Sequence, residues 1–146
     1  MKELKNYHAL FENKIFMGGA ADVESMIKNE GIEVVVDLRE EATGCAYPEA
    51  KVKWVQVALG DNAKVSQETL FKKAIDEVVH AYNDGKKVAF HCGGGKGRTG
   101  TVASGVLIAL GQALTVDEAE QKAKNIRSII DIKSSQKESL HKIFGN

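Results

Sequence analysis

Short apolar segments and longer amphipathic segments alternate along the chain. The apolar segments are rich in β-branched and aromatic residues and predict buried strands. They are Ile15–Met17, Ile32–Leu38, Val52–Leu59 and the strand from Lys87 to Cys92. The segments between and after them repeat their apolar residues at helical spacing. This alternation predicts an α/β three-layer sandwich, with a mostly parallel sheet of four or five strands flanked by helices.

Capping residues mark where the helices begin. Asp22 precedes a short helix from Val23 to Asn29, and Ser66 precedes a long one that continues to about Tyr82. A further helix follows Arg98. Two capping boxes, Thr115–Glu118 and Ser135–Glu138, predict the last two helices. We expect residues 1–146 to form a single domain.

Composition narrows the class of protein. The 146 residues include 20 basic and 20 acidic ones, so no overall positive charge favours binding to nucleic acid. No apolar segment is long enough to span a membrane or resembles a secretion signal. The two cysteines are too few for a disulfide framework. We therefore expect a cytoplasmic protein, and a monomer.

The segment from Lys87 to Gly100 carries the candidate chemistry. A cysteine, Cys92, ends the predicted strand, and Arg98 opens the next helix six positions later. The residues between them are Gly93, Gly94, Gly95, Lys96 and Gly97. Such a loop can point its backbone N–H groups at one anion, which would hold the thiol as thiolate. Arg98 offers a planar fork that suits two phosphate oxygens.

Glycine-rich loops after a strand also occur in unrelated kinds of site. Residues 95–100 match the dinucleotide pattern G-x-G-x-x-G, but the acidic residue expected about twenty positions later would fall inside a predicted helix. A Walker A loop requires Gly-Lys-Ser/Thr, whereas Gly97 follows Lys96. A purely structural turn with a buried cysteine is the third alternative. A sulfurtransferase also uses a loop cysteine after a strand, but Arg98 and Thr99 favour phosphate.

The segment His91–Gly100 fits the signature H-C-x-x-G-x-x-R-[S/T]-G and resembles the cysteine-dependent protein tyrosine phosphatases, in particular their compact dual-specificity branch. The likeness extends from about Ile15 to the last helix. It implies that Cys92 attacks phosphorus and that the loop amides from Gly93 to Arg98 bind the phosphate oxygens. It also implies that Thr99 helps the thiolate to leave and that His91 supports the loop.

A leaving group also needs a proton donor. Asp61 is our candidate, because it follows a predicted strand, 31 residues before Cys92, where the compact branch carries its general acid. Asp61 as a mere turn residue is the alternative. Asp37 is the competing acid, although at the end of a buried strand we expect it to fix the adjoining loop.

Three further residues each have two interpretations. Lys96 either favours highly anionic substrates, as in phosphoinositide-directed relatives, or is a solvated loop lysine. Arg127 resembles an arginine that contacts a second anionic group, but we favour a helix-surface or ion-pairing arginine. Cys45 is expected to be a passive loop cysteine rather than a redox partner of Cys92.

The sequence thus predicts a metal-independent phosphomonoesterase without cofactors, acting on phosphorylated proteins as a protein-tyrosine or dual-specificity phosphatase. The same mechanism on a phosphoinositide or a small phosphorylated metabolite is the first alternative. A weakly active module that binds phosphorylated ligands is the second. The four histidines are scattered, and no Cys/His spacing suggests a metal site.

Overall fold

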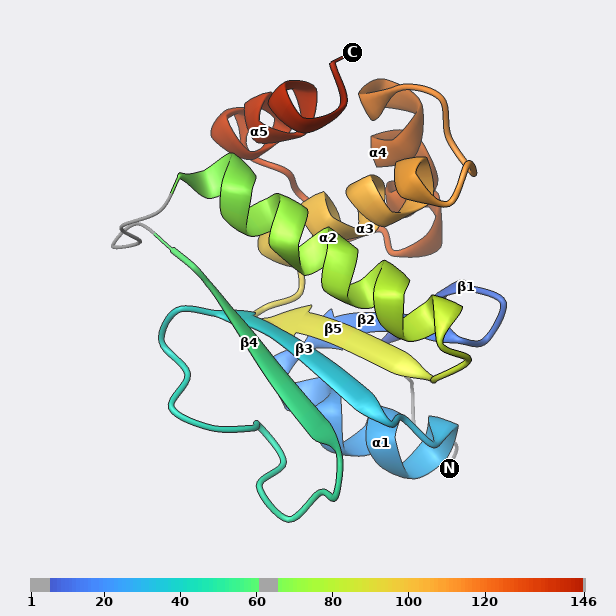
Figure 1. The fold of residues 1–146 in the computed structure, drawn as a ribbon, viewed down its shortest axis with the longest axis vertical. Helices are drawn as coiled ribbons and strands as arrows, with labels where there is room; N and C mark the ends of the chain where they lie inside the picture. The colour runs from blue at the N-terminus through green and yellow to red at the C-terminus, as the bar shows by residue number, and fades with distance from the viewer. Residues whose placement is uncertain (1–5, 61–65, 146) are drawn as a thin grey trace.

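The computed structural model describes residues 6–60 and 66–145. Its centre is a five-stranded sheet with the strand order β1-β2-β5-β3-β4 (Figure 1). The strands are β1 (His8–Phe11), β2 (Ile15–Gly19), β3 (Val34–Arg39), β4 (Lys53–Leu59) and β5 (Val88–Cys92). The four strands β2 to β5 run parallel, and β1 joins the edge antiparallel to β2.

Helices cover both faces of the sheet (Figure 1). One face carries α1 (Val23–Glu30), which follows the short 3₁₀ turn η1 (Ala20–Asp22). The other face carries the four remaining described helices. These are α2 (Gln67–Asn83), α3 (Arg98–Ala109), α4 (Val116–Ile126) and α5 (Ser134–Phe144). The predicted α/β sandwich with a mostly parallel sheet is confirmed.

The central strands are buried on both sides, and successive side chains point to opposite faces. On β5, Val88, Phe90 and Cys92 belong to the hydrophobic core under α2–α5, whereas Ala89 belongs to the core around α1. His91, between Phe90 and Cys92, therefore projects toward the α1 side. The nucleophile candidate and its neighbour thus lie on different faces of the sheet.

Two predictions about elements need correction. The strand β1 was not predicted, because in His8–Phe11 only Leu10 is buried and no regular alternation marks the segment. The helix α5 begins at Ser134, so the capping box at Ser135–Glu138 is wrong. The backbone N–H of Lys133 instead donates to the Gln136 side chain over 2.9 Å. The predicted N-cap Thr115 is confirmed, since its hydroxyl accepts from Glu118 N over 3.1 Å.

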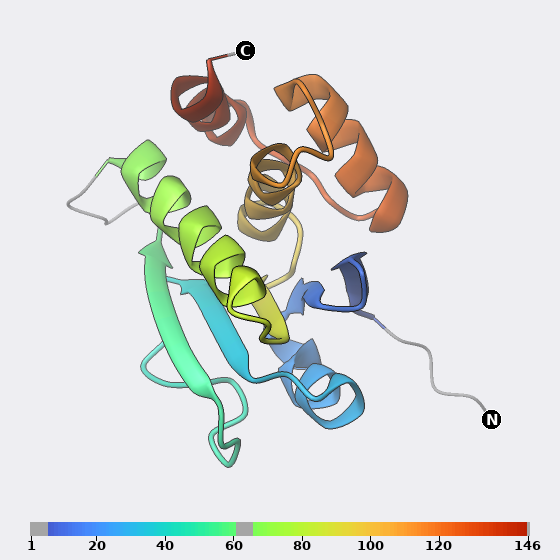
Figure 2. The same cartoon turned by 45° about the vertical axis from the view of Figure 1, so that its right-hand side comes forward.

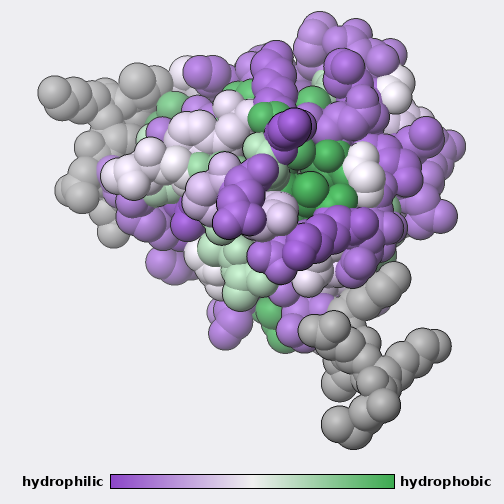
Figure 3. Space-filling view, turned by 90° about the horizontal axis from the view of Figure 1, so that it is seen from below, coloured by the Kyte–Doolittle hydropathy of each residue, from purple (hydrophilic) through white to green (hydrophobic). Residues whose placement is uncertain are grey.

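The surface is largely hydrophilic where it is seen from below the sheet, with a small apolar area in the middle (Figure 3). Isolated apolar surface of this kind is normal for folded proteins. Among the described helices, none is both long and apolar enough to cross a membrane.

Candidate active site

The candidate site lies at the carboxyl end of β5, where a ligand is expected in a parallel sheet. Gly19, the last residue of β2, pairs with Cys92 in the sheet register, so the loop 93–97 starts beside the end of β2. A Cβ on Gly19 would lie 2.9 Å from Gly93 O, so this close approach requires glycine. The loop then leads into α3 on the side of the sheet that carries α2–α5 (Figure 2).

The Cys92 thiol is enclosed by the loop and is only 3% exposed. Its Sγ accepts hydrogen bonds from Gly95 N, over 3.2 Å, and from Thr99 Oγ1, over 3.1 Å. Gly95 adopts φ +74°, a conformation that disfavours other residues, and this turns its N–H onto the sulfur. Both donors thus point at the sulfur atom that would act as the nucleophile.

Three carbonyl groups of the loop are held by groups outside both the loop and α3. They are Gly93 O, which accepts from Ala20 N (3.0 Å), Gly95 O, which accepts from Arg127 Nε (2.9 Å), and Lys96 O, which accepts from Asp131 N (3.2 Å). In a planar trans peptide the carbonyl and the following N–H point in opposite directions. The N–H groups of Gly94, Lys96 and Gly97 therefore point away from these partners. Donors turned away from the surrounding protein in this way can form the cradle that an anion needs.

Arg98 uses one edge of its guanidinium to contact the protein. Nη1 and Nη2 donate to the two carboxylate oxygens of Glu41 over 3.0 and 3.2 Å, and Nη1 also donates to Leu59 O over 3.0 Å. The other edge, formed by Nε and the second Nη2 hydrogen, has no oxygen acceptor among the described residues. The hydrogen bonds to Glu41 raise the pKa of Arg98, and the nearby Cys92 sulfur raises it further. The Nε–Nη2 edge of the guanidinium is suited to bind two phosphate oxygens.

Glu41 is a site residue that the sequence analysis missed. The hydrogen bonds from Arg98 lower the pKa of its carboxyl, so it stays ionised beside the loop. Glu41 lies two residues after the end of β3, in a charged segment of the chain. The one available signal was the position of this charged segment, at the same edge of the sheet as Cys92.

His91 and Asp37 form the buried support beneath the loop. They are register partners on neighbouring strands, and both are fully buried. His91 Nδ1 donates to Cys92 O over 3.0 Å, and Nε2 lies 3.7 Å from Asp37 Oδ1. Burial lowers the pKa of His91, and the Asp37 carboxylate only partly offsets this effect.

Asp37 is strongly anchored and cannot reach a substrate. Its carboxylate accepts from Arg39 Nε (2.9 Å), from Arg39 Nη2 (2.8 Å) and from Trp54 Nε1 (3.0 Å). Burial alone would raise the pKa of Asp37, but these hydrogen bonds and the His91 ring bring it below the ordinary value. The expectation that Asp37 fixes the adjoining loop agrees with these contacts.

The remaining residues that the sequence analysis singled out lie in different environments. Asp61 lies outside the described residues, directly after Gly60. Lys96 is exposed on the loop. Arg127 is only 2% exposed and has no carboxylate within ion-pairing distance among the described residues, so the favoured surface or ion-pairing role is wrong. Cys45 is a free, half-buried cysteine in the loop after β3.

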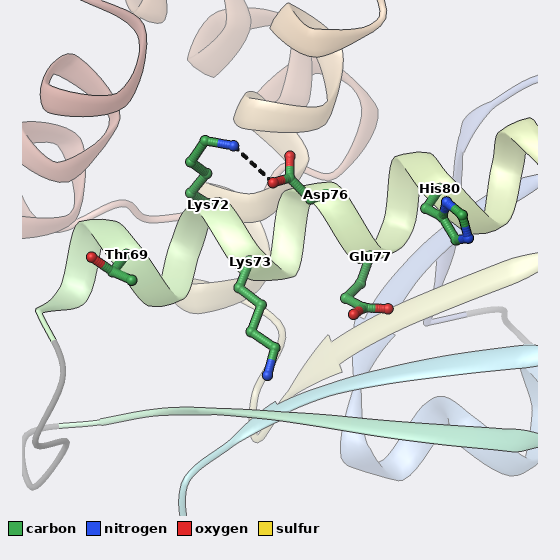
Figure 4. Close-up of a pocket in the computed structure, with 6 residues that line it drawn as sticks. All are labelled: Thr69, Lys72, Lys73, Asp76, Glu77 and His80. Carbon is green, nitrogen blue, oxygen red and sulfur yellow. Dashed lines mark hydrogen bonds and ion pairs between the residues drawn. The ribbon is translucent and has the colours of Figure 1, made fainter.

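A depression of about 380 Å³ opens beside the loop. It is lined by Gly93, Gly94 and Arg127 together with residues of the N-terminal segment and η1. A larger depression of about 480 Å³ lies on α2 and is lined by that helix alone (Figure 4). Its Lys72 and Asp76 pair with each other over 2.8 Å, and the side chains in it are those of an ordinary charged helix surface.

No group of three or more His, Cys, Asp or Glu side chains suited to a metal ion occurs in the described ranges 6–60 and 66–145.

Comparison with known proteins identifies the class. The family model described as "Polymorphic toxin system, DSP-PTPase phosphatase" matches residues 14–112, which is more than half of the chain. The chain belongs to this family of dual-specificity-type tyrosine phosphatases.

One curated relative is the dual specificity protein phosphatase PHS1 of Arabidopsis thaliana, 26% identical over 123 residues. The match covers 81% of this chain but only 13% of that protein. The chain therefore corresponds to a small part of this relative.

Solved structures share the fold. A mouse putative dual specificity phosphatase complexed with zinc tungstate superimposes with a TM-score of 0.83 at 19% identity, over 99% of this chain and 90% of that one. Human DUSP28 gives 0.80 at 17% identity, over 98% and 95%. PTPMT1, also solved in complex with PI(5)P, gives 0.78 at 22% identity, over 95% and 94%.

Proposed function

We propose that the chain hydrolyses phosphomonoesters in two steps through a phosphocysteine on Cys92, without a metal ion. The observation that carries this proposal is the environment of the Cys92 sulfur. It receives a backbone N–H from Gly95 and the Thr99 hydroxyl, and it lies beside the free edge of Arg98. A purely phosphate-binding module would have no use for a thiol held in this way.

In the first step the Cys92 thiolate attacks phosphorus, and the P–S bond forms as the P–O bond to the leaving group breaks. The inward N–H groups of the loop and the Arg98 edge bind the three remaining phosphoryl oxygens. The departing oxygen takes a proton, which we assign to Asp61. Leu59 O binds Arg98, so the strand that leads to Asp61 ends next to the cradle.

In the second step water attacks the phosphocysteine, and the P–S bond breaks to release phosphate. Asp61, now ionised, accepts the proton of this water. The sulfur leaves as thiolate, and the Thr99 hydroxyl donates to it. The same hydroxyl also lies 3.2 Å from Gly18 O, which can hold its one proton until the leaving sulfur attracts it.

For the substrate we propose phosphotyrosine and phosphoserine or phosphothreonine in proteins, in keeping with the dual-specificity family. A phosphoinositide is the second candidate, because PTPMT1, a structural neighbour, has been solved in complex with PI(5)P. The exposed Lys96 on the loop would suit such a highly anionic ligand. Because the thiol must stay reduced, we also propose a cytoplasmic location.

The proposal is tested with the purified chain and its Cys92→Ser variant on an aryl phosphate, phosphopeptides and phosphoinositides. The variant should lose turnover but still bind substrate, and the wild type should stay active in the presence of a chelator. Turnover by Cys92→Ser, or loss of wild-type activity with the chelator, would remove the thiol mechanism. The relative rates on the panel decide between the two substrate classes.

Asp61 has its own test. Asp61→Asn should slow hydrolysis of esters with poor leaving groups by about 10²–10⁴. It should affect a good leaving group such as p-nitrophenolate much less. Equal effects on both kinds of ester would remove Asp61 from the mechanism.

A further inference from the structure

Arg127 is a buried cation that the phosphatase chemistry leaves unexplained. It follows α4 directly and is 2% exposed. Nε donates to Gly95 O over 2.9 Å, and Nη1 donates to Asn6 O and to His8 Nδ1, the latter over 3.1 Å. All three of these acceptors are neutral. Burying a guanidinium costs free energy, and without an ion pair the polar contacts must compensate for it.

The contact with Gly95 O has a direct consequence for the loop. The Gly95 carbonyl and the Lys96 N–H belong to one planar peptide and point in opposite directions. A hydrogen bond that pulls the carbonyl toward Arg127 therefore turns the Lys96 N–H away from Arg127. The preceding N–H, that of Gly95, already points at the Cys92 sulfur.

The space around this peptide is closed. A Cβ placed on Gly95 would lie 2.5 Å from Arg127 Nη2 and 2.8 Å from Gly18 C. The guanidinium and the end of β2 therefore leave no room for a side chain on Gly95.

The hydrogen bond from Arg127 to Gly95 O differs from the bonds that fix Gly93 O and Lys96 O. Gly93 O and Lys96 O are bound by backbone N–H groups, which no substitution of a side chain removes. Of the three, Gly95 O alone is bound by a side chain. One mutation can therefore release one donor of the cradle and leave the other two in place.

We propose that Arg127 is a positioning residue of the phosphate cradle. It orients the Gly95–Lys96 peptide so that the Lys96 N–H faces the phosphoryl group, and it does not itself touch the substrate. This inference rests on the proposed function of the loop.

The test compares Arg127→Met, which keeps the aliphatic stem and removes the donors, with the wild type and with Lys124→Met. Lys124 lies on α4 with a partly exposed side chain and pairs with Glu120. Arg127→Met should lower kcat by about 10- to 100-fold and weaken inhibition by orthovanadate by a similar factor, with less than a threefold change in KM. Lys124→Met should match the wild type. Arg127→Lys should recover part of the loss, because an ammonium can still donate to Gly95 O.

A second readout needs no catalysis. In ¹⁵N-labelled wild type, orthovanadate should shift the amide signals of Gly94, Lys96 and Gly97. In Arg127→Met the response of Lys96 should be lost while those of Gly94 and Gly97 remain. Retention of the Lys96 response together with wild-type kcat would overturn the inference, whereas inactivity of the wild type itself would refute only the proposed function.

The inference stays testable if Arg127→Met does not fold. The Arg127 Nε–H signal of the wild type should then be protected from exchange with water and should shift when orthovanadate binds. A freely exchanging Nε–H would contradict the hydrogen bond on which the inference depends.

Discussion

At the carboxyl end of β5, the two faces of the sheet carry different kinds of polar groups. On the α2–α5 side, Cys92 sits in a loop whose donors are mostly backbone N–H groups. On the α1 side, the buried His91 and Asp37 lie in a network of side chains that includes the half-buried Arg39 and Trp54. The residues His91 and Cys92 are consecutive, so the alternation of a strand separates the two environments.

This difference separates function from stability. The α2–α5 side keeps one edge of Arg98 free of oxygen acceptors beside the thiol, so substitutions there should change activity and leave folding almost unaffected. The α1 side contains a buried carboxylate that accepts several hydrogen bonds, so substitutions there should chiefly lower the free energy of unfolding.

Arg98→Lys should have the largest effect. An ammonium cannot bind two phosphate oxygens in a fork, nor hold Glu41 and Leu59 O at the same time. We expect kcat/KM for an aryl phosphate to fall by about 10³ and the urea midpoint of unfolding to stay near that of the wild type. A loss of less than tenfold would show that the fork is not used.

Asp37→Asn should act on stability instead. Removing the charge leaves Arg39 without its buried partner, and we expect a loss of about 3 kcal/mol in the free energy of unfolding, measured with urea at neutral pH. Asp76→Asn, in the exposed pair with Lys72 on α2, is the matched control and should change it by less than about 0.5 kcal/mol. Equal effects of the two substitutions would contradict the distinction between the faces.

The substitution Asp37→Asn should also change how the free energy of unfolding depends on pH. The pKa of Asp37 is lower in the folded protein than its ordinary value of about 3.9, so its stabilisation is complete above that value. It is lost as the pH falls through the folded-state pKa. Asp37→Asn should therefore show a shallower loss of stability below about pH 4 than the wild type, in urea titrations at several pH values.

Thr99→Val should have a smaller effect, confined to the second step. Losing one hydrogen bond to a charged sulfur should slow release of the thiolate by about tenfold. The initial burst of p-nitrophenol should become more visible in stopped-flow measurements as kcat falls. Thr99→Ser retains the hydroxyl and should behave like the wild type; a slow Ser variant would assign the effect to packing.

Glu41→Gln should have the smallest effect. The Glu41 side chain is 58% exposed, and exposed ion pairs contribute little. We expect KM to rise about threefold at low ionic strength, with the difference from the wild type shrinking as salt is added. A hundredfold loss of kcat would instead place Glu41 in direct contact with the reacting groups.

The sequence was most informative where local pattern determines structure. The four parallel strands and the helices around them follow from the spacing of apolar residues and from capping residues. The positions of Cys92, Arg98 and Thr99 follow from a single continuous segment. The peptide orientations inside the loop depend on Ala20, Arg127 and Asp131, which lie far away in the chain.

The features that the sequence did not predict share one physical cause, which is dependence on tertiary contacts. β1 forms because β2 offers it an edge, and its own sequence carries little strand signal. Arg127 looks like a helix-surface residue until α4 is packed beside β1. Glu41 becomes a site residue only because β3 brings its following loop to the end of β5.

The most direct test of the account is to look for phosphate on Cys92 itself. The chain is mixed with an aryl phosphate, quenched in acid within the first turnover and digested for mass spectrometry. Thr99→Val, with its slower second step, should raise the yield. A phosphoryl group is expected on the peptide that carries Cys92, and it should be absent when Cys92→Ser is used. Turnover with no modified Cys92 at any time, in either the wild type or Thr99→Val, would contradict a phosphocysteine intermediate.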